Sequence, residues 1–159
     1  MYFEETLIFT NVEAETKEDV LRKMSHNLYE KGLVKETYKE AVLEREKNFA
    51  TGLPTNYYSV ALPHTDVEHV NKEAISVAVL KNPVPFGVMG GEESEETPVK
   101  VVFLLAMNQK HSQLELLKRL MQLFSNEEVL MKIVKEENKT VMKECILDAL
   151  DFELKGGEG

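Results

Sequence analysis

Histidine is the scarce reactive side chain of this sequence, which contains four of them: His26, His64, His69 and His111. His64 directly follows the apolar run VALP at residues 60–63, so its imidazole stands at the carboxyl end of a predicted strand. Ligands of α/β sheets bind at that edge, and the fixed φ of a proline holds the residue after it in a defined place. His64 is therefore the first candidate for a residue that does chemistry.

His111 has a matching position in the last third of the chain. It follows the apolar run 99–106 after a short loop and opens a predicted helix, where free backbone N–H groups favour an anion. Two such histidines would suit a transferable phosphoryl group, with one ring as nucleophile and the other as hydrogen-bond donor. The spacing alone leaves open the alternative that they are two unrelated loop histidines.

Arg45 interrupts an apolar stripe on a predicted helix. It lies four residues from both Ala41 and Phe49, which places the three side chains on one face. Either the arginine extends past its neighbours to the surface, or it is aimed at an anionic group.

A metal site is a further alternative for this region. Residues 64–69 (HTDVEH) offer two histidines and two carboxylates, which zinc accepts as ligands. Clustering in a loop does not make side chains converge, however, and no second ligand group is evident. We expect no metal and no cofactor.

Other chemistry lacks support in the sequence. Glycine-rich nucleotide-binding loops, the Gly-x-Ser-x-Gly elbow and His-Glu-x-x-His are all missing. Cys145 lies in a helical pattern and is interpreted as a small core or surface residue. His26, in mid-helix among polar neighbours, is predicted to lie on the surface.

The predicted elements alternate as strand, two helices, three strands and about three helices, which indicates an α/β domain. Strands are predicted at residues 6–12, 57–62, 75–80 and 99–106, with a loop at 51–56 and a chain break at Pro83 and Pro85. Helices are predicted from a Thr16 cap to Gly32, at 35–48, at 111–124, from a Ser125–Glu128 capping box to 135, and at 138–150. The inner face of the helix at 111–124 is predicted to hold Leu114, Leu117, Leu120, Met121 and Phe124.

Length and charge narrow the function classes. The 159 residues predict one domain over residues 1–152 and a flexible tail at 153–159. The net charge of −9 argues against nucleic acid as a partner. A single cysteine, no signal-peptide pattern and a longest apolar run of only residues 101–107 predict a cytoplasmic protein without membrane insertion.

Several segments of the sequence together carry a resemblance to a known family. The sequence has Arg45-Glu46 at the end of a predicted helix, TGL at 51–53 and VALPHTD at 60–66, followed by VPFGVM at 84–89, VVFLLA at 101–106 and His111 ahead of a leucine-rich helix. Over nearly the whole chain it resembles enzyme IIA of the fructose–mannitol type, the phosphocarrier domains of the bacterial sugar phosphotransferase system. The strand–Pro–His element with the upstream Arg-Glu is the most specific part.

The resemblance implies a fold and a reaction. The fold is α/β, a three-layer sandwich with a central mixed β-sheet flanked by helices. His64 would accept a phosphoryl group from the phosphocarrier HPr and pass it to a cysteine of the cognate enzyme IIB, which serves the membrane component IIC. Arg45 would stabilise the phosphoryl group and His111 would donate a hydrogen bond to it. We expect the ring nitrogen of His64 that faces Arg45 to be the one phosphorylated.

Details of the loop before His64 point to one branch of the family. The stretch 45–64 is longer than in mannitol or nitrogen-regulatory members and looks like the galactitol branch, which often lacks a histidine at the position of His111. The residues that carry this likeness are Glu46, Phe49, Thr51 and Gly52. We therefore expect a stand-alone IIA subunit, without a IIB or IIC domain, that serves a galactitol-like polyol or sugar. The alternative is a regulatory module that signals by its phosphorylation state to a regulator or transporter.

Overall fold

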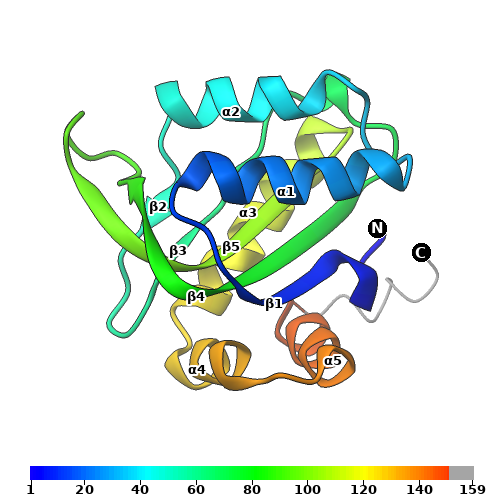
Figure 1. The fold of residues 1–159 in the computed structure, drawn as a ribbon. Coiled ribbons are helices and arrows are strands. Elements are labelled where there is room, and N and C mark those ends of the chain that lie inside the picture. Colours follow the sequence, from blue (N-terminus) through cyan, green and yellow to red (C-terminus); the bar gives the residue numbers. More distant parts are fainter. Residues whose placement is uncertain (151–159) are drawn as a thin grey trace.

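The computed structural model describes residues 1–150, which form a five-stranded sheet in the order β1-β4-β5-β3-β2 with helices on both faces (Figure 1). The strands are β1 (Ile8–Val12), β2 (Gly52–Leu53), β3 (Ser59–Ala61), β4 (Ala74–Gly87) and β5 (Glu96–Ala106). The helices are α1 (Lys17–Glu30), α2 (Tyr38–Asn48), α3 (Lys110–Phe124), α4 (Glu127–Lys135) and α5 (Lys139–Leu150), with short 3-10 turns η1 (Glu5–Leu7) and η2 (Val67–His69). The tail predicted at 153–159 lies outside the described residues, and the single domain over 1–152 stays a prediction.

The sheet is mixed. Its long central strands β4 and β5 pair antiparallel, β1 pairs parallel with β4, β3 pairs parallel with β5, and β2 pairs antiparallel with β3. The ladder between β1 and β4 is interrupted between Phe9 and Val12, where Asn11 adopts a φ of 53°. Asparagine is one of the few residues that enter this left-handed region readily.

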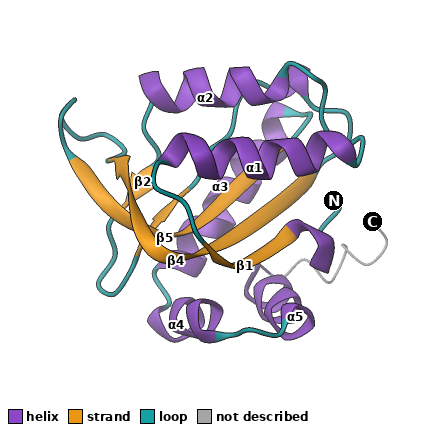
Figure 2. Ribbon diagram, in the orientation of Figure 1, coloured by secondary structure: helices purple, strands orange, loops and turns teal. Residues whose placement is uncertain are grey.

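Two hydrophobic cores lie on opposite faces of the sheet. Since side chains alternate along a strand, Val102, Leu104 and Ala106 of β5 pack in the core beneath α1 and α2. Val101, Phe103 and Leu105 pack in the other core, with α3, α4 and α5. Figure 2 shows α1 and α2 on one side of the strands and α4 and α5 on the other. The predicted three-layer α/β sandwich is confirmed.

Helix starts follow the capping chemistry of the sequence, with one correction. The Thr16 side chain accepts a hydrogen bond from the Asp19 N–H at 3.1 Å, as predicted. The predicted Ser125 cap of α4 is wrong, because Asn126 takes that position and accepts from the Val129 N–H at 3.2 Å. Ser125 instead ends α3 and donates to the carbonyl of Gln122.

Several strand boundaries differ from the prediction. β4 does not break at Pro83 and Pro85 but continues to Gly87, with a register shift between Val79 and Val84. Pro83 lies in this irregular stretch, where a ladder hydrogen bond is already missing, and Pro85 pairs with Pro98, which also has no N–H to donate. The predicted loop at 51–56 contains the short strand β2, while the strands predicted at 6–12 and 57–62 shrink to β1 and β3. The helix predicted from residue 35 begins at Tyr38.

Two predicted inner faces also need correction. On α3, Leu114 and Met121 are 63% and 45% exposed, and the buried side chains are Leu116, Leu120, Leu123 and Phe124. On α2 the predicted inner residue Phe49 is 63% exposed. The buried residues of that helix are Tyr38, Val42 and Glu46. The buried stripe through Tyr38 and Val42 thus continues to Glu46, whereas the predicted stripe through Ala41 and Arg45 ends on the exposed Phe49.

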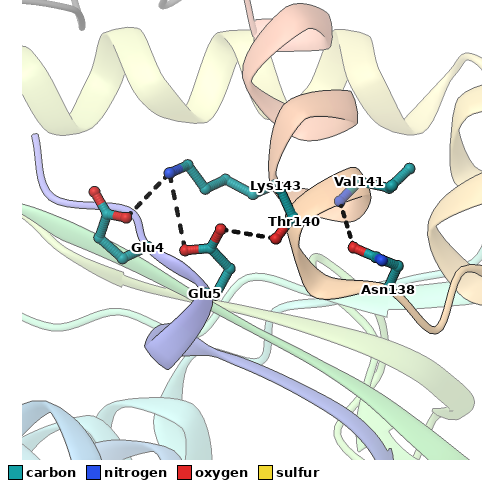
Figure 3. Close-up of polar contacts among 6 residues, drawn as sticks. All are labelled: Glu4, Glu5, Asn138, Thr140, Val141 and Lys143. Carbon is teal, nitrogen blue, oxygen red and sulfur yellow. Dashed lines mark hydrogen bonds and ion pairs between the residues drawn. The ribbon is translucent and has the colours of Figure 1, made fainter.

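Polar contacts hold the last helix to the start of the chain (Figure 3). The ammonium group of Lys143 on α5 lies 3.0 Å from a carboxylate oxygen of Glu4 and 3.9 Å from one of Glu5. The hydroxyl of Thr140 donates to Glu5 at 3.0 Å. The hydrogen bond of the Glu5 carboxyl to the backbone of Glu5, and after it the one from Thr140, lower the pKa of this carboxyl. The contacts join segments that lie at opposite ends of the described chain.

Candidate functional site

His64 stands three residues beyond the end of β3, and the sheet positions its backbone. The carbonyl of the preceding residue, Pro63, accepts a hydrogen bond from the N–H of Leu105 in β5 at 3.0 Å. The carbonyl of Leu105 in turn accepts from the hydroxyl of Tyr38 on α2 at 2.6 Å, in the buried interior. The pairing of β3 with β5 therefore extends to the residue before the histidine, and α2 is fixed to the same residue of β5, Leu105.

The imidazole of His64 is oriented by its own backbone. Its Nδ1 lies 2.8 Å from the carbonyl oxygen of Leu62. A carbonyl can only accept a hydrogen bond, so Nδ1 carries the proton and Nε2 of the neutral ring keeps its lone pair. Partial burial lowers the pKa of His64 most strongly, and the Arg45 cation lowers it further, against the raising effects of the Leu62 hydrogen bond and of Asp66. A neutral ring with a free Nε2 is a nucleophile.

Arg45 reaches toward the segment that holds His64. One guanidinium nitrogen lies 3.8 Å from a carboxylate oxygen of Asp66, and the guanidinium stands over the ring of Phe49, 5.0 Å from its centre. The Nε atom is buried and has no hydrogen-bond partner among the described residues. The side chain is 37% exposed, so Arg45 combines access to solvent with an orientation toward an acidic group and His64.

Glu46 and Thr51 form a buried pair whose part in the site the sequence analysis missed. Glu46 is 2% exposed, and its two carboxylate oxygens accept from the backbone N–H of Thr51 at 2.8 Å and from its hydroxyl at 2.7 Å. The Thr51 hydroxyl also accepts from the N–H of Leu62 at 3.2 Å. The spacing of Tyr38, Val42 and Glu46 at every fourth residue was the available signal. This spacing places Glu46 on the same buried face of α2 as Tyr38 and Val42.

Burial dominates the ionisation of Glu46. It raises the pKa of the carboxyl from 4.5 to about 7, against the lowering effects of the two Thr51 hydrogen bonds and of the cations Lys17 and Arg45. A proton on this carboxyl is therefore exchanged near neutral pH.

His111 lies apart from His64 in its contacts. It is exposed, the second residue of α3, and it borders a cavity of about 260 Å³ together with Met1, Glu73 and Met107. Within residues 1–150 no hydrogen bond or ion pair joins it to His64 or Arg45. Its role as a donor to the phosphoryl group stays a prediction.

The remaining candidates do not assemble into a second site. His26 is exposed on α1 beside Glu30, and Nδ1 of His69 shares a hydrogen bond of 2.8 Å with the Thr37 hydroxyl. Cys145 is half-buried against the core beneath α3–α5, and its burial raises the pKa of the thiol. Across residues 1–150 no three His, Cys, Asp or Glu side chains gather as a metal site. None of the described helices has the length and apolar character needed to cross a membrane.

Comparison of the sequence with protein-family models identifies the family of this chain. Residues 1–149 match the family model described as "Phosphoenolpyruvate-dependent sugar phosphotransferase system, EIIA 2". The chain belongs to this EIIA family. Membership confirms the resemblance identified from the sequence, and with it the prediction of a phosphotransferase component that transfers phosphoryl groups.

Several individual relatives agree with the family. Over 105 residues the chain is 35% identical to the mannitol-specific EIICBA component of Buchnera aphidicola, covering 65% of this chain and 16% of that protein. Over 134 residues it is 28% identical to the transcriptional regulator ManR of Bacillus subtilis, covering 83% and 19%. Over 102 residues it is 28% identical to the galactitol-specific EIIA component of Escherichia coli K12, covering 64% and 67%. The chain thus spans less than a fifth of the first two relatives.

Solved EIIA structures share the fold along almost the entire chain. The crystal structure of enzyme IIA mannitol from E. coli aligns with a TM-score of 0.71 at 26% identity, covering 94% of this chain and 99% of that one. The solution structure of the E. coli complex between enzyme IIA mannitol and phosphorylated enzyme IIB mannitol aligns with a TM-score of 0.70 at 25% identity and the same coverage. The mixed sheet between two helical layers is therefore the EIIA arrangement.

The His64 ring geometry makes a spectroscopic prediction. Because the folded pKa lies below the ordinary value of 6.5, the unfolded chain binds this proton more tightly, and stability is lost as the pH falls below about 6.5. Long-range ¹H–¹⁵N NMR during a pH titration should find a neutral ring at pH 7 with the proton on Nδ1, and a midpoint below 6.5. A neutral ring protonated on Nε2 would contradict the hydrogen bond to Leu62.

Glu46 is expected to change the stability of the protein with pH in the opposite direction to His64. Because its folded pKa of about 7 lies above 4.5, the folded protein holds the proton more tightly, and this contribution to stability is lost as the pH rises from about 4.5 to about 7. Between about pH 5 and pH 8 the free energy of unfolding should lose roughly 2–3 kcal/mol that Glu46→Gln does not lose. Urea unfolding of wild type and variant at both pH values measures the difference.

The matched control for this experiment is Glu44→Gln on the same helix, since Glu44 is exposed and, among residues 1–150, accepts a hydrogen bond from Asn48 alone. This variant should keep the wild-type pH dependence. Equal pH dependence in Glu46→Gln and wild type would show that Glu46 titrates as an ordinary carboxyl.

Proposed function

We propose that the chain is a phosphocarrier that accepts a phosphoryl group on Nε2 of His64 from phosphorylated HPr and passes it to a cysteine of its cognate enzyme IIB. The observation that carries the proposal is the hydrogen bond between Nδ1 of His64 and the Leu62 carbonyl, which leaves Nε2 as the nucleophilic atom. The EIIA family and the neighbour solved with phosphorylated enzyme IIB support it.

In the proposed phosphoryl transfer His64 neither gains nor loses a proton. In the first step the lone pair of Nε2 attacks phosphorus, the bond from phosphorus to the HPr histidine breaks, and that imidazole leaves with its electron pair. The phosphorylated ring of His64 then carries a positive charge, because Nδ1 keeps its proton, and the Leu62 carbonyl stabilises this charge. In the second step a thiolate of enzyme IIB attacks phosphorus and His64 leaves as the neutral imidazole.

Arg45 supplies positive charge to the transferred group in this proposal. Its guanidinium is close enough to depress the pKa of His64, and its buried Nε lacks a partner among the described residues. Donors aimed at a transferring phosphoryl group stabilise the transition state more than the ground state. His111 is the second proposed donor, and it would reach the group from the start of α3.

The proposed system serves a galactitol-like polyol or sugar in the cytoplasm, with the membrane component IIC as an indirect partner. The galactitol-specific relative and the loop between Arg45 and His64 support this branch, whereas mannitol-specific relatives match the chain as well. The chain would need neither cofactor nor metal and would bind no nucleic acid.

A regulatory module is the second candidate function, favoured by one observation. The match to the transcriptional regulator ManR covers 83% of this chain, so the same kind of domain occurs in a protein named for regulation. In that case the phosphorylation state of His64 would signal to a regulator or transporter rather than supply a sugar.

Phosphorylation at His64 is tested with enzyme I, phosphoenolpyruvate and HPr. Wild type should acquire one acid-labile, base-stable phosphoryl group, with the Nε2 isomer identified by ³¹P–¹⁵N NMR. His64→Ala should acquire none, and Arg45→Ala should be labelled at least about 100-fold more slowly. His69→Ala is the matched control and should be labelled normally. Equal labelling of His64→Ala, or the Nδ1 isomer in wild type, would overturn the mechanism.

The substrate branch is tested by the second transfer step. Phosphorylated protein should pass its label to a purified galactitol-type enzyme IIB at least about tenfold faster than to a mannitol-type enzyme IIB, because recognition of the partner sets specificity. Failure to label either one, together with capture of a regulator only in one phosphorylation state, would favour the regulatory function.

A further inference from the structure

The carboxyl group of Glu46 is buried at the edge of the proposed phosphorylation site without contacting the reacting atoms. Burying a carboxyl is costly unless its oxygens are hydrogen-bonded. Here both oxygens have partners, and both partners belong to Thr51. The two hydrogen bonds from Thr51 offset the cost of burying this carboxyl. In return, the carboxyl fixes the position of Thr51.

A directed series of hydrogen bonds runs from His64 back to Glu46. The Nδ1–H of His64 donates to the Leu62 carbonyl at 2.8 Å. The Leu62 N–H donates to the Thr51 hydroxyl at 3.2 Å and to the Thr51 carbonyl at 3.3 Å. The Thr51 hydroxyl, which has one proton, donates it to Glu46 at 2.7 Å. Because the hydroxyl donates to the carboxyl, its lone pairs are free to accept from Leu62.

The same series connects the two elements that supply the proposed reacting groups. Glu46 follows Arg45 on α2, and Thr51 lies between α2 and β2, next to Gly52, which pairs with Ala61 of β3. Figure 1 shows the chain passing from α2 to β2 at the edge of the sheet. The Glu46–Thr51 contacts are therefore in a position to hold the end of α2, with Arg45, at a set distance from the segment that carries His64.

We propose that Glu46 is a positioning residue which, through Thr51 and the backbone of Leu62, holds His64 in the Nδ1–H tautomer and holds Arg45 beside it. The effect on phosphoryl transfer rests on the proposed function, whereas the effect on the ring of His64 does not. Glu46 exchanges no atoms with the phosphoryl group. Its contribution is the geometry in which Nε2 and the guanidinium meet that group.

An amide cannot replace the carboxyl in this position. Both oxygens of Glu46 accept, one from an N–H and one from an O–H. In Glu46→Gln one of these oxygens becomes an NH₂ group, which must face either the Thr51 N–H or the Thr51 hydroxyl. The first is a clash of two donors. In the second the hydroxyl must accept from the amide instead of donating to the carboxyl, so its proton loses its partner at Glu46.

The experiment compares His64 ring nitrogens in unphosphorylated full-length variants by long-range ¹H–¹⁵N NMR. Glu46→Gln and Thr51→Val, which lacks only the hydroxyl, should lose the single Nδ1–H form and show ¹⁵N shifts averaged between the two tautomers. Thr51→Ser, which keeps the hydroxyl, and Glu44→Gln on the exposed side of α2 should retain the wild-type shifts. Thermal unfolding of each variant establishes that it is folded, and Thr51→Val decides the matter if Glu46→Gln does not fold.

The rate of phosphorylation by phosphorylated HPr is the second measurement. Glu46→Gln and Thr51→Val should be slowed at least about tenfold, since small displacements of reacting groups have effects of this size, and Thr51→Ser should recover most of the rate. Wild-type ring shifts in folded Glu46→Gln and Thr51→Val would overturn the positioning role. A wild type that HPr fails to phosphorylate would instead refute the proposed function, and the ring shifts would still decide the role of Glu46.

Discussion

The backbone of Leu105 is the point on which the rest of the molecule depends. Its N–H donates to the carbonyl of Pro63, and its carbonyl accepts from the buried hydroxyl of Tyr38. One residue of the central strand thereby joins the helix that carries Arg45 to the residue before His64. Because β5 is covered on both faces, the backbone of Leu105 is shielded from water, and its hydrogen bonds have no solvent to compete with them.

Arg45 is the positive charge that lies beside His64. The protein carries a net charge of −9, yet the group it is proposed to carry is itself an anion. Arg45 is shared between Asp66, the ring of Phe49 and the surroundings of His64. A half-buried cation that is already engaged by Asp66 and Phe49 binds an added anion less strongly than a free one would, which suits the proposed carrier function.

Local chemistry made the Thr16 cap and the place of His64 just beyond a strand predictable from the sequence, because each rests on neighbours within a few residues, while the roles of His64 and Arg45 stay predictions. The errors arose where a distant contact decides. Phe49 was predicted to face inward because it is as apolar as Val42, and only packing against the sheet separates the two. Pro83 and Pro85 stay in β4 because a long partner strand continues beside them. The Glu46–Thr51–Leu62 series spans two loops and the strands β2 and β3, so no local sequence pattern predicts it.

The edge strands β1 and β2 affect which surfaces of the protein can bind other molecules. On one side the sheet ends in β2, which is two residues long and followed by Pro54. On the other side it ends in β1, whose ladder is interrupted at Asn11. Neither edge presents the long, regular row of free N–H and C=O groups that invites another strand. Self-association into extended sheets is thereby disfavoured, and encounters with other proteins are left to helices, loops and side chains.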